Sequence, residues 1–557
     1  SSKDKWSKFD SMVVPYHWDD RTKLYEDYLY LKKFQEAVLK EIGLKLNDLH
    51  DTKKGEKYWK ILIAPWLNHF IQIIFDRWVM VNFALKNHDI SEANILIVDE
   101  SDTISFDYAD FCIRANTDLW NGVIYGEILR EIGSVPIKEI IRDEDIKGSL
   151  RIKGRVNLTS KIKGRLKAMI NWISSRLSSP NNFFLLATYL PRKYEMAIQL
   201  MLGQVPNIWF EQEIQKGINI NTGLRERLFV SSCEDGGFEN FARKLVFKYM
   251  PIAYLEGYYN LLKAVKKTSW PSTPKIIFTS NAMYTNEVFK AWVAEKVYNG
   301  TPFIIGQHGG NYGNALFSTF EDLELSISDS YLTWGWSGKG RLEGKIKPTF
   351  NFKVVNKEQK WDPKGQLLIV LLALPRYSNS IYACPISSQF IKYLADQLLF
   401  MKELSEPIQK EILVRLFHND YECSVKERIL CEFPDVKIDI GRSRISKLIA
   451  QCKIYVSTYN ATTFLESLSL NVPTIMFWNP EHWELREEAK PYFQGLLKIG
   501  ILHYSPESAA KKVVEVWDNV EEWWAHENLQ NVRMVFCNQY SRVEKRPLTL
   551  LSKTLRR

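Results

Sequence analysis

The hydrophobic pattern changes along the chain and divides it into regions. Over residues 20–90, apolar side chains recur every three or four positions, which predicts long amphipathic helices. From residue 94 onward, short apolar runs alternate with helical patterns, as in parallel sheets built from β-α-β units. The predicted strands form two series, 94–99, 182–190, 275–281, 302–310 and 331–336, followed by 366–375, 411–419, 436–441, 453–460 and 472–479.

A polar, lysine-rich stretch at 339–365 separates the two series and marks a predicted domain boundary. With 557 residues, the chain is long enough for two large domains. The pattern predicts an N-terminal α/β domain with helical additions (1–345), a C-terminal Rossmann-like domain (360–530), and a final helix with a basic tail (531–557). The predicted fold class is therefore α/β, with two Rossmann-like domains facing each other across a central cleft.

Composition narrows the class of protein. The chain is 45% hydrophobic and 25% charged, which is typical of a globular protein. Its net charge of +9 is spread along the chain, so we expect no nucleic-acid partner but a mild attraction to anionic substrates or a membrane surface. The most apolar stretch, 61–75, is too short and too polar to span a bilayer and predicts a buried helix.

The spacing of the cysteines indicates a cellular compartment and argues against a metal site. The seven cysteines show no CxxC spacing, which indicates reduced thiols in the cytoplasm and no zinc site. No Asp or His set has convincing metal-ligand spacing, so no metal cofactor is expected. The first residue is serine rather than methionine, which indicates a processed or engineered chain, cut from a longer protein.

The stretch "STYNATTFLES" (457–467) combines a strand end, a hydroxyl-rich turn and a helix start. The N-terminus of a helix carries unpaired N–H groups and partial positive charge, which suit a phosphate. Hydroxyl and amide donors would assist, and Glu466 is placed to accept ribose hydroxyls. The alternative is ordinary N-capping, which needs one such residue. The candidate donors are Ser457, Thr458, Asn460, Thr462 and Thr463.

A second candidate group follows the strand at 411–419. Arg415 and His418 would lie at the same sheet edge, where a guanidinium can bind a departing phosphate and an imidazole can protonate it. The alternative for His418 is a structural role. In the first domain, "GQHGGNYG" (306–313) places Gln307, His308, Gly309 and Gly310 after a strand. Glycines there permit close approach of a ligand, and His308 can orient a sugar hydroxyl or act as acid or base; otherwise the motif is a tight turn.

Two stretches carry a resemblance to a known family. "VRLFHND" (414–420), followed by "DIGRSRISKLIAQCKIYVSTYNATTFLESLSLNVPTIMFW", resembles the donor half of bacterial cell-surface glycosyltransferases of the GT-B fold that use CMP-Kdo. "YWKILIAPWLNHFIQIIFDRW" (58–78) and "GQHGGNYG" resemble the β-Kdo transferase module of WbbB-type O-antigen synthases. Here His418 precedes Asn419, where that family has proline.

The resemblance implies a GT-B-like fold and a retaining transfer of Kdo from CMP-Kdo to an oligosaccharide or lipid-linked O-antigen acceptor. The enzyme would work without a metal, in the cytoplasm and peripherally on the inner face of the inner membrane. Further transferase domains of the same synthase would be its partners. A CMP-sugar leaves with one phosphate, which helix dipole, hydroxyls, Arg and His can neutralise. The carboxylate of Kdo needs a cation, for which Arg376 is the candidate.

The position of the nucleophile differs between this chain and the family that it resembles. The resemblance implies an Asp nucleophile in the turn "FVSSCEDGGFENF" (229–241), where this chain has Cys233, Glu234 and Asp235. Cys233 then occupies the nucleophile position, or is simply a small buried residue. Three alternatives remain: an inverting Kdo or sialic acid transferase with Glu234 or Asp235 as base, a CDP-glycerol glycerophosphotransferase, and a non-catalytic glycan-binding module of a larger synthase.

Overall fold

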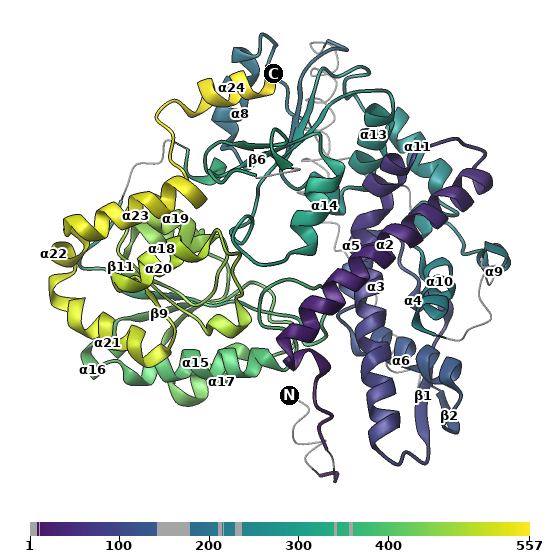
Figure 1. The fold of residues 1–557 in the computed structure, drawn as a ribbon, viewed down its shortest axis with the longest axis horizontal. Coiled ribbons are helices and arrows are strands. Elements are labelled where there is room, and N and C mark those ends of the chain that lie inside the picture. The colour runs from purple at the N-terminus through teal and green to yellow at the C-terminus, as the bar shows by residue number, and fades with distance from the viewer. Residues whose placement is uncertain are drawn as a thin grey trace, which may run out of the picture.

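The fold was analysed in a computed structural model of the 557-residue chain. The structure describes residues 8–10, 12–141, 179–209, 214, 217–228, 237–338, 342–355 and 360–556. Figure 1 shows two α/β regions, with long N-terminal helices packed beside the first.

The N-terminal helices form the layer that the 3.6-residue periodicity predicts. The short helix η1 (His17–Asp19) is followed by α2 (Arg21–Leu49) and α3 (Glu56–Asn87), and Asp20 caps α2 by accepting from the backbone N–H of Thr22. The apolar stretch 61–75 lies inside α3, which packs against α2 and α13 (Glu287–Tyr298), so the predicted buried helix is confirmed. None of the described helices is both long and apolar enough to cross a membrane.

The N-terminal domain contains two parallel sheets. In the smaller one, β1 (Ala93–Ile97) pairs with β2 (Ile137–Ile141). In the larger one, β3 (Phe184–Leu186), β4 (Ile277–Thr279), β5 (Phe303–Gly306), β6 (Ser330–Thr333) and β7 (Ile346–Pro348) lie in chain order. The other helical elements of this half are α4 (Glu100–Thr103), α5 (Tyr108–Arg114), α6 (Asp118–Ile132), α8 (Arg192–Met201), α9 (Thr222–Leu228), α10 (Phe238–Tyr249), η3 (Ile252–Tyr254), α11 (Tyr258–Lys266), α12 (Ala282–Thr285), α14 (Thr319–Ile327) and η5 (Phe352–Val354).

The C-terminal domain is a doubly wound sheet with strand order β10-β9-β8-β11-β12-β13. Its strands are β8 (Gln366–Val370), β9 (Ile412–Arg415), β10 (Lys437–Asp439), β11 (Cys452–Ser457), β12 (Thr474–Phe477) and β13 (Leu502–His503). The chain starts in the middle at β8 and later continues on the other side at β11, which creates a topological switch point between these two strands. Its helices are α15 (Gln389–Glu403), α16 (Glu406–Gln409), α17 (Val425–Glu432), α18 (Ile445–Ala450), α19 (Thr463–Ser469), η6 (Pro480–His482), α20 (Lys490–Lys498), α21 (Pro506–Val516), η7 (Trp517–Asn519) and α22 (Val520–Ala525).

Every predicted strand corresponds to a strand of the structure, and the predicted α/β class with a GT-B-like pair of Rossmann-like domains is confirmed. Strands β2, β7 and β13 were not predicted from the sequence. Strand β7 lies inside the lysine-rich stretch taken as the boundary, at the edge of its sheet, where polar residues and Pro348 are tolerated. Strand β13 has only two residues, too few for a periodic signal.

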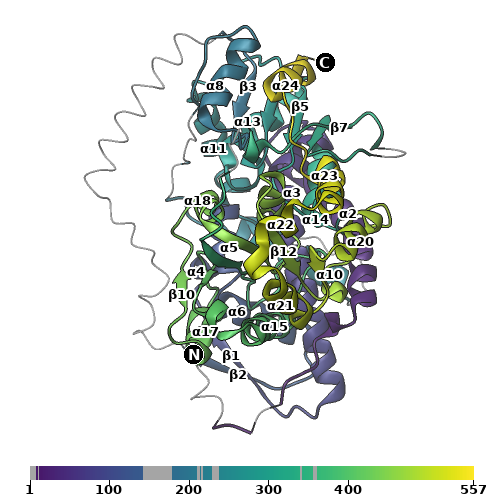
Figure 2. The ribbon, with the colours of Figure 1, turned by 90° about the vertical axis from the view of Figure 1, so that its left-hand side faces the viewer.

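The chain crosses back to the first domain at its end. After α23 (Glu527–Tyr540), the backbone N–H of Arg542 donates to the carbonyl of Trp334 at 2.7 Å, and α24 (Pro547–Arg556) packs against α8. Figures 1 and 2 both show α24 beside α8, far from the sheet that precedes it in sequence. Leu551 and Leu555 of α24 are fully buried, so this predicted tail is an anchored helix.

Candidate functional site

Two loops predicted separately from the sequence meet across the domain boundary. A Cβ atom at Gly310 would lie 1.7 Å from the carbonyl oxygen of Ala461, so the loop after β5 touches the turn after β11, backbone against backbone. Beside this contact, the Asn460 side chain donates to Oδ1 of Asn314 at 2.9 Å. Both loops leave the carboxyl ends of parallel strands, where α/β proteins bind ligands.

His308 lies against a buried carboxylate at this meeting point. Its Nδ1 is 3.4 Å from Oε1 of Glu324, and its Nε2 is 3.3 Å from the hydroxyl of Tyr312. Burial, and after it the positive charge of Lys353, lower the pKa of His308 to about 3. The imidazole is therefore neutral at neutral pH and can accept a hydrogen bond.

Glu324 is a fully buried carboxyl group ringed by tyrosine hydroxyls. Tyr284 and Tyr312 donate to its Oε1 at 2.6 and 2.9 Å, and Tyr331 donates to its Oε2 at 2.9 Å. Burial raises the pKa of Glu324 to about 8, although these three hydrogen bonds lower it. This carboxyl group therefore changes its charge near neutral pH, directly beside His308.

Lys353 connects the two domains in front of His308. Its Nζ lies 3.9 Å from Oε1 of Glu466 and 4.8 Å from the ring centroid of Tyr189. The Tyr189 ring stacks on His308, with centroids 6.2 Å apart. Tyr189 has a left-handed backbone with φ of +61°, which is strained for a tyrosine, and such strain gathers at functional sites. Glu466, Lys353, Tyr189 and His308 thus form a continuous polar row.

Most of the hydroxyl groups in the loop 457–463 are bonded within the protein. Ser457 donates to the carbonyl of Tyr459 at 3.1 Å, and Thr458 donates to the carbonyl of Val370 at 2.8 Å. The Thr458 bond joins the ends of β11 and β8 at the switch point. The hydroxyl of Thr463 lies 2.5 Å from that of Tyr455. These groups therefore shape the loop, whereas Thr462, at the start of α19, makes no side-chain cap within the described chain.

His418 and Arg415 lie at the same sheet edge but in different surroundings. His418 is exposed and lines a cavity of about 220 Å3 with residues from the loops after β8, β9 and β10. Arg415 instead pairs with Asp439, which holds that side chain at the strand end. His418 is therefore accessible to a ligand, and Arg415 reaches one only by sharing its charge with Asp439.

Arg376 is engaged between the domains. Its guanidinium pairs with Asp118 at the start of α6, and a second carboxylate, Glu422, lies 3.4 Å away. Two acidic partners neutralise the cation that the sequence analysis chose for a sugar carboxylate. In the described structure, Lys353 places a cation beside His308 instead.

Gln307 and Gly309 support the loop after β5. The Gln307 amide donates to the carbonyl of Gly309 at 2.8 Å and accepts from the backbone N–H of Trp334 at 2.9 Å. Gly309 leaves room for Tyr312, whose ring would lie 2.6 Å from a Cβ atom. Both residues thus position His308 and Tyr312.

Cys233, Glu234 and Asp235 lie outside the described residues, so the predicted nucleophile turn stays a prediction. Across the described ranges, no group of three His, Cys, Asp or Glu side chains is arranged to hold a metal ion.

Sequence reasoning missed Tyr189, Glu324 and Lys353. Tyr189 lies near the end of the predicted strand 182–190, and its position at a strand end was the available signal. Glu324 lies within the helix α14, and only tertiary packing, which brings Tyr284 and Tyr331 onto its carboxyl group, makes it a buried acid. Lys353 lies in the stretch that was predicted to be the domain boundary, where a lysine is expected to be exposed to solvent.

The chain was compared with protein families, curated proteins and solved structures, and only the family match bears on the reaction class. A family described as LIC12162 family transferase matches residues 1–555, and no curated protein matches the chain. Among solved structures, the chain is similar to MurG of Acinetobacter baumannii, with 11% identity over 54% of this chain and 80% of that one and a TM-score of 0.29. A mutant of the O-GlcNAc transferase of Thermobaculum terrenum has 9% identity over 94% and 97% of the two chains and a TM-score of 0.34. WaaG, titled a glycosyltransferase involved in lipopolysaccharide biosynthesis, has 9% identity over 67% and 98% and a TM-score of 0.30. Because the family match spans almost the entire sequence, this chain belongs to the LIC12162 family of transferases.

Proposed function

We propose that this chain is a glycosyltransferase that moves Kdo from CMP-Kdo to the end of an O-antigen glycan. The observation that carries the proposal is the contact between the loops at Gly310 and Ala461. A transferase must hold two substrates together, and here each domain contributes one loop to the same place. Membership in a transferase family supports the reaction class.

The donor side of the proposal rests on α19 and the neighbouring strand ends. Glu466 is almost fully buried and is positioned to accept hydroxyls of a ribose, with Thr462 at the helix start for the phosphate. The cavity beside His418 opens at the same sheet edge and leaves room for the nucleoside. We assign the carboxylate of Kdo to Lys353 rather than Arg376, since Asp118 and Glu422 already engage Arg376.

The acceptor side rests on His308 and Glu324. A neutral imidazole beside an acceptor hydroxyl can accept its hydrogen bond, and it can take the proton once the donor carboxylate offsets the charge of Lys353, which lowers the pKa of His308. Glu324 lies 3.4 Å from the same ring. Transfer with retention, the course implied by the family resemblance, would instead use a nucleophile at 233–235. The His308–Glu324 pair favours, as a second candidate, a direct inverting transfer with His308 as base.

We further propose that the enzyme works in the cytoplasm at the membrane surface, where a lipid-linked acceptor is presented.

The first experiment is a thermal-shift panel with CMP, CDP, UDP, GDP and freshly made CMP-Kdo, with and without EDTA. We expect stabilisation by CMP and CMP-Kdo that survives EDTA. Glu466→Ala should weaken CMP binding about tenfold, the effect of losing a hydrogen bond to a charged group. Glu515→Ala, an exposed residue paired with Lys512, is the matched control and should leave CMP binding unchanged.

A preference for UDP or GDP, or equal CMP binding in Glu466→Ala, would overturn the donor assignment. The stereochemical course follows from the anomer of the product, read by NMR. Retention would support the covalent route, and intact-mass analysis would then show a sugar adduct at residues 233–235. Inversion would support His308 as base.

A further inference from the structure

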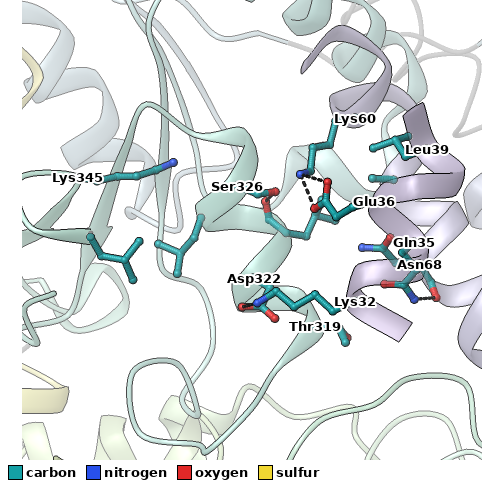
Figure 3. Close-up of a pocket in the computed structure, with 14 residues that line it drawn as sticks. Lys32, Gln35, Glu36, Leu39, Lys60, Asn68, Thr319, Asp322, Ser326 and Lys345 are labelled. Carbon is teal, nitrogen blue, oxygen red and sulfur yellow. Dashed lines mark hydrogen bonds and ion pairs between the residues drawn. The ribbon is translucent and has the colours of Figure 1, made fainter. Parts of the chain in front are cut away.

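A second cavity lies apart from the His308 site, among the N-terminal helices. It has a volume of about 360 Å3 and lies between α2, α3, α14 and the start of β7. Figure 3 shows its lining, with polar side chains from three of these elements facing one space. Its size falls within the range of small-molecule sites in proteins. None of the residues assigned to the transferase reaction lines it.

The charges of this cavity do not cancel. Lys60 pairs with Glu36 at 2.6 Å, and Lys32 pairs with Asp322 at 2.9 Å, so these four side chains neutralise one another. The fifth charged residue of the lining, Lys345, has no ion-pair partner within the described part of the chain. In Figure 3 its amine points toward Ser326 and the Lys60–Glu36 pair.

The position of Lys345 is unfavourable for a lone cation. Its side chain is half-buried, and both burial and the neighbouring charge of Lys57 lower its pKa. Asp329 is the acidic group that offsets this effect, but it already bonds to Lys57 at 2.6 Å. A partly buried cation without a partner is costly unless an anion joins it.

The rest of the lining suits a polar molecule. Four side chains with amides or hydroxyls face the cavity beside five apolar side chains, and amides and hydroxyls are the groups that bind sugar hydroxyls. The uncharged polar residues are Gln35, Asn68, Thr319 and Ser326, and the apolar ones are Leu39, Ala64, Leu323, Leu325 and Leu342.

We propose that this cavity binds a sugar-sized ligand with one anionic group, a phosphate or a carboxylate, which lies against Lys345. The hydroxyls of the ligand meet Gln35, Asn68 and Ser326. The Lys60–Glu36 and Lys32–Asp322 pairs frame the site without adding net charge. This site is distinct from the proposed donor site and does not depend on it.

The test is isothermal titration calorimetry of the full chain with three probes, glucose 6-phosphate, glucuronate and glucose. We expect one of the two anionic sugars to bind at least about tenfold more tightly than glucose, which lacks the charge. The stronger of the two identifies the anionic group as phosphate or carboxylate. Lys345→Gln should weaken that binding about tenfold, and Lys345→Arg, which keeps the charge, should retain it within about threefold.

Lys402→Gln is the matched control, because Lys402 is an exposed lysine paired with Glu432 on another part of the surface. It should bind like the wild type. Glu466→Ala should also keep anionic-sugar binding, which separates this site from the donor site. Three outcomes would overturn the proposal. These are no heat with both anionic sugars at about 10 mM, glucose binding as tightly as the anionic sugars, and unchanged binding in a folded Lys345→Gln variant.

Discussion

The two large sheets organise their ends in different ways. In the C-terminal sheet the chain starts in the middle, so the loops after β8 and β11 emerge side by side at a switch point. In the N-terminal sheet the strands β3 to β7 follow one another in chain order, so these described strands form no switch point. The C-terminal candidates therefore come mainly from adjacent loops. The N-terminal cluster instead combines Tyr189, His308, Glu324 and Lys353, which are far apart in sequence.

The two candidate sites therefore depend on different kinds of contact. Continuous stretches supply the C-terminal site, and its shape depends on local bonds such as that from Thr458 to Val370. The N-terminal cluster depends on tertiary packing, since Glu324 meets its hydroxyl donors only when α12, α14 and β6 are in place. Perturbing the packing should therefore damage the N-terminal cluster more than the C-terminal loop.

The largest effect should come from separating the two loops. Gly310→Ala places a methyl group on the carbonyl of Ala461, so the loops must move apart, and a displacement of about 1 Å can cost about 100-fold in rate. We expect transferase activity to fall by about that factor, measured with CMP-Kdo and an acceptor glycan. Gly122→Ala adds the same methyl group where nothing lies within 4 Å, and should leave activity intact. Full activity in Gly310→Ala would show that this contact does not position the substrates.

The next effect tests the buried carboxyl group. The pKa of Glu324 is raised to about 8, so the folded protein keeps its proton at pH values where the unfolded chain has lost it. The unfolding free energy should therefore fall as pH rises from about 5 to 8, by up to about 1.4 kcal/mol per pH unit from this group. Urea unfolding of the wild type and Glu324→Gln at several pH values checks this. The difference between the two proteins should shift with pH over that window, and a constant difference would contradict the buried, protonated state.

The smallest effect distinguishes the two candidate cations. Lys353→Gln should weaken CMP-Kdo binding about tenfold and change CMP binding much less, because only the sugar carries a carboxylate. Arg376→Gln should change CMP-Kdo binding less than about twofold, since Asp118 and Glu422 already engage this guanidinium. Competitive titration against a fluorescent CMP derivative measures both. The reverse order would restore Arg376 as the group that meets the donor sugar.

The fold could be predicted from sequence because its strands are short, buried and apolar. The missed strands β2 and β7 lie at sheet edges, where burial is incomplete and the pattern is weak, whereas β13 is buried but only two residues long. Strand 94–99 was found, but its pairing with β2 in a separate sheet was not, because pairing depends on contacts distant in sequence.

Only the parts of the site that are formed by continuous stretches of sequence could be predicted. The loop at 457–466 and the glycine-rich loop at 306–313 were visible as motifs, and the structure brings them together. Which hydroxyls face a ligand was not visible, because Ser457 and Thr458 are satisfied by carbonyl groups of the protein. The ion pair of Arg376 with Asp118 joins residues from both domains, and no local sequence pattern indicates such a partner.

The return of the chain at Arg542 has a mechanical consequence. Two covalent connections run between the domains, one between η5 and β8 and the other between α23 and α24, and the backbone N–H of Asn351 donates to the carbonyl of Arg542 where they lie together. Because these connections lie side by side at Asn351 and Arg542, we expect them to resist separation of the domains at this point more than rotation about it. A label on α24 moves with the N-terminal domain, since α24 packs against α8, and a change in its distance to a label on α21 would report such a rotation.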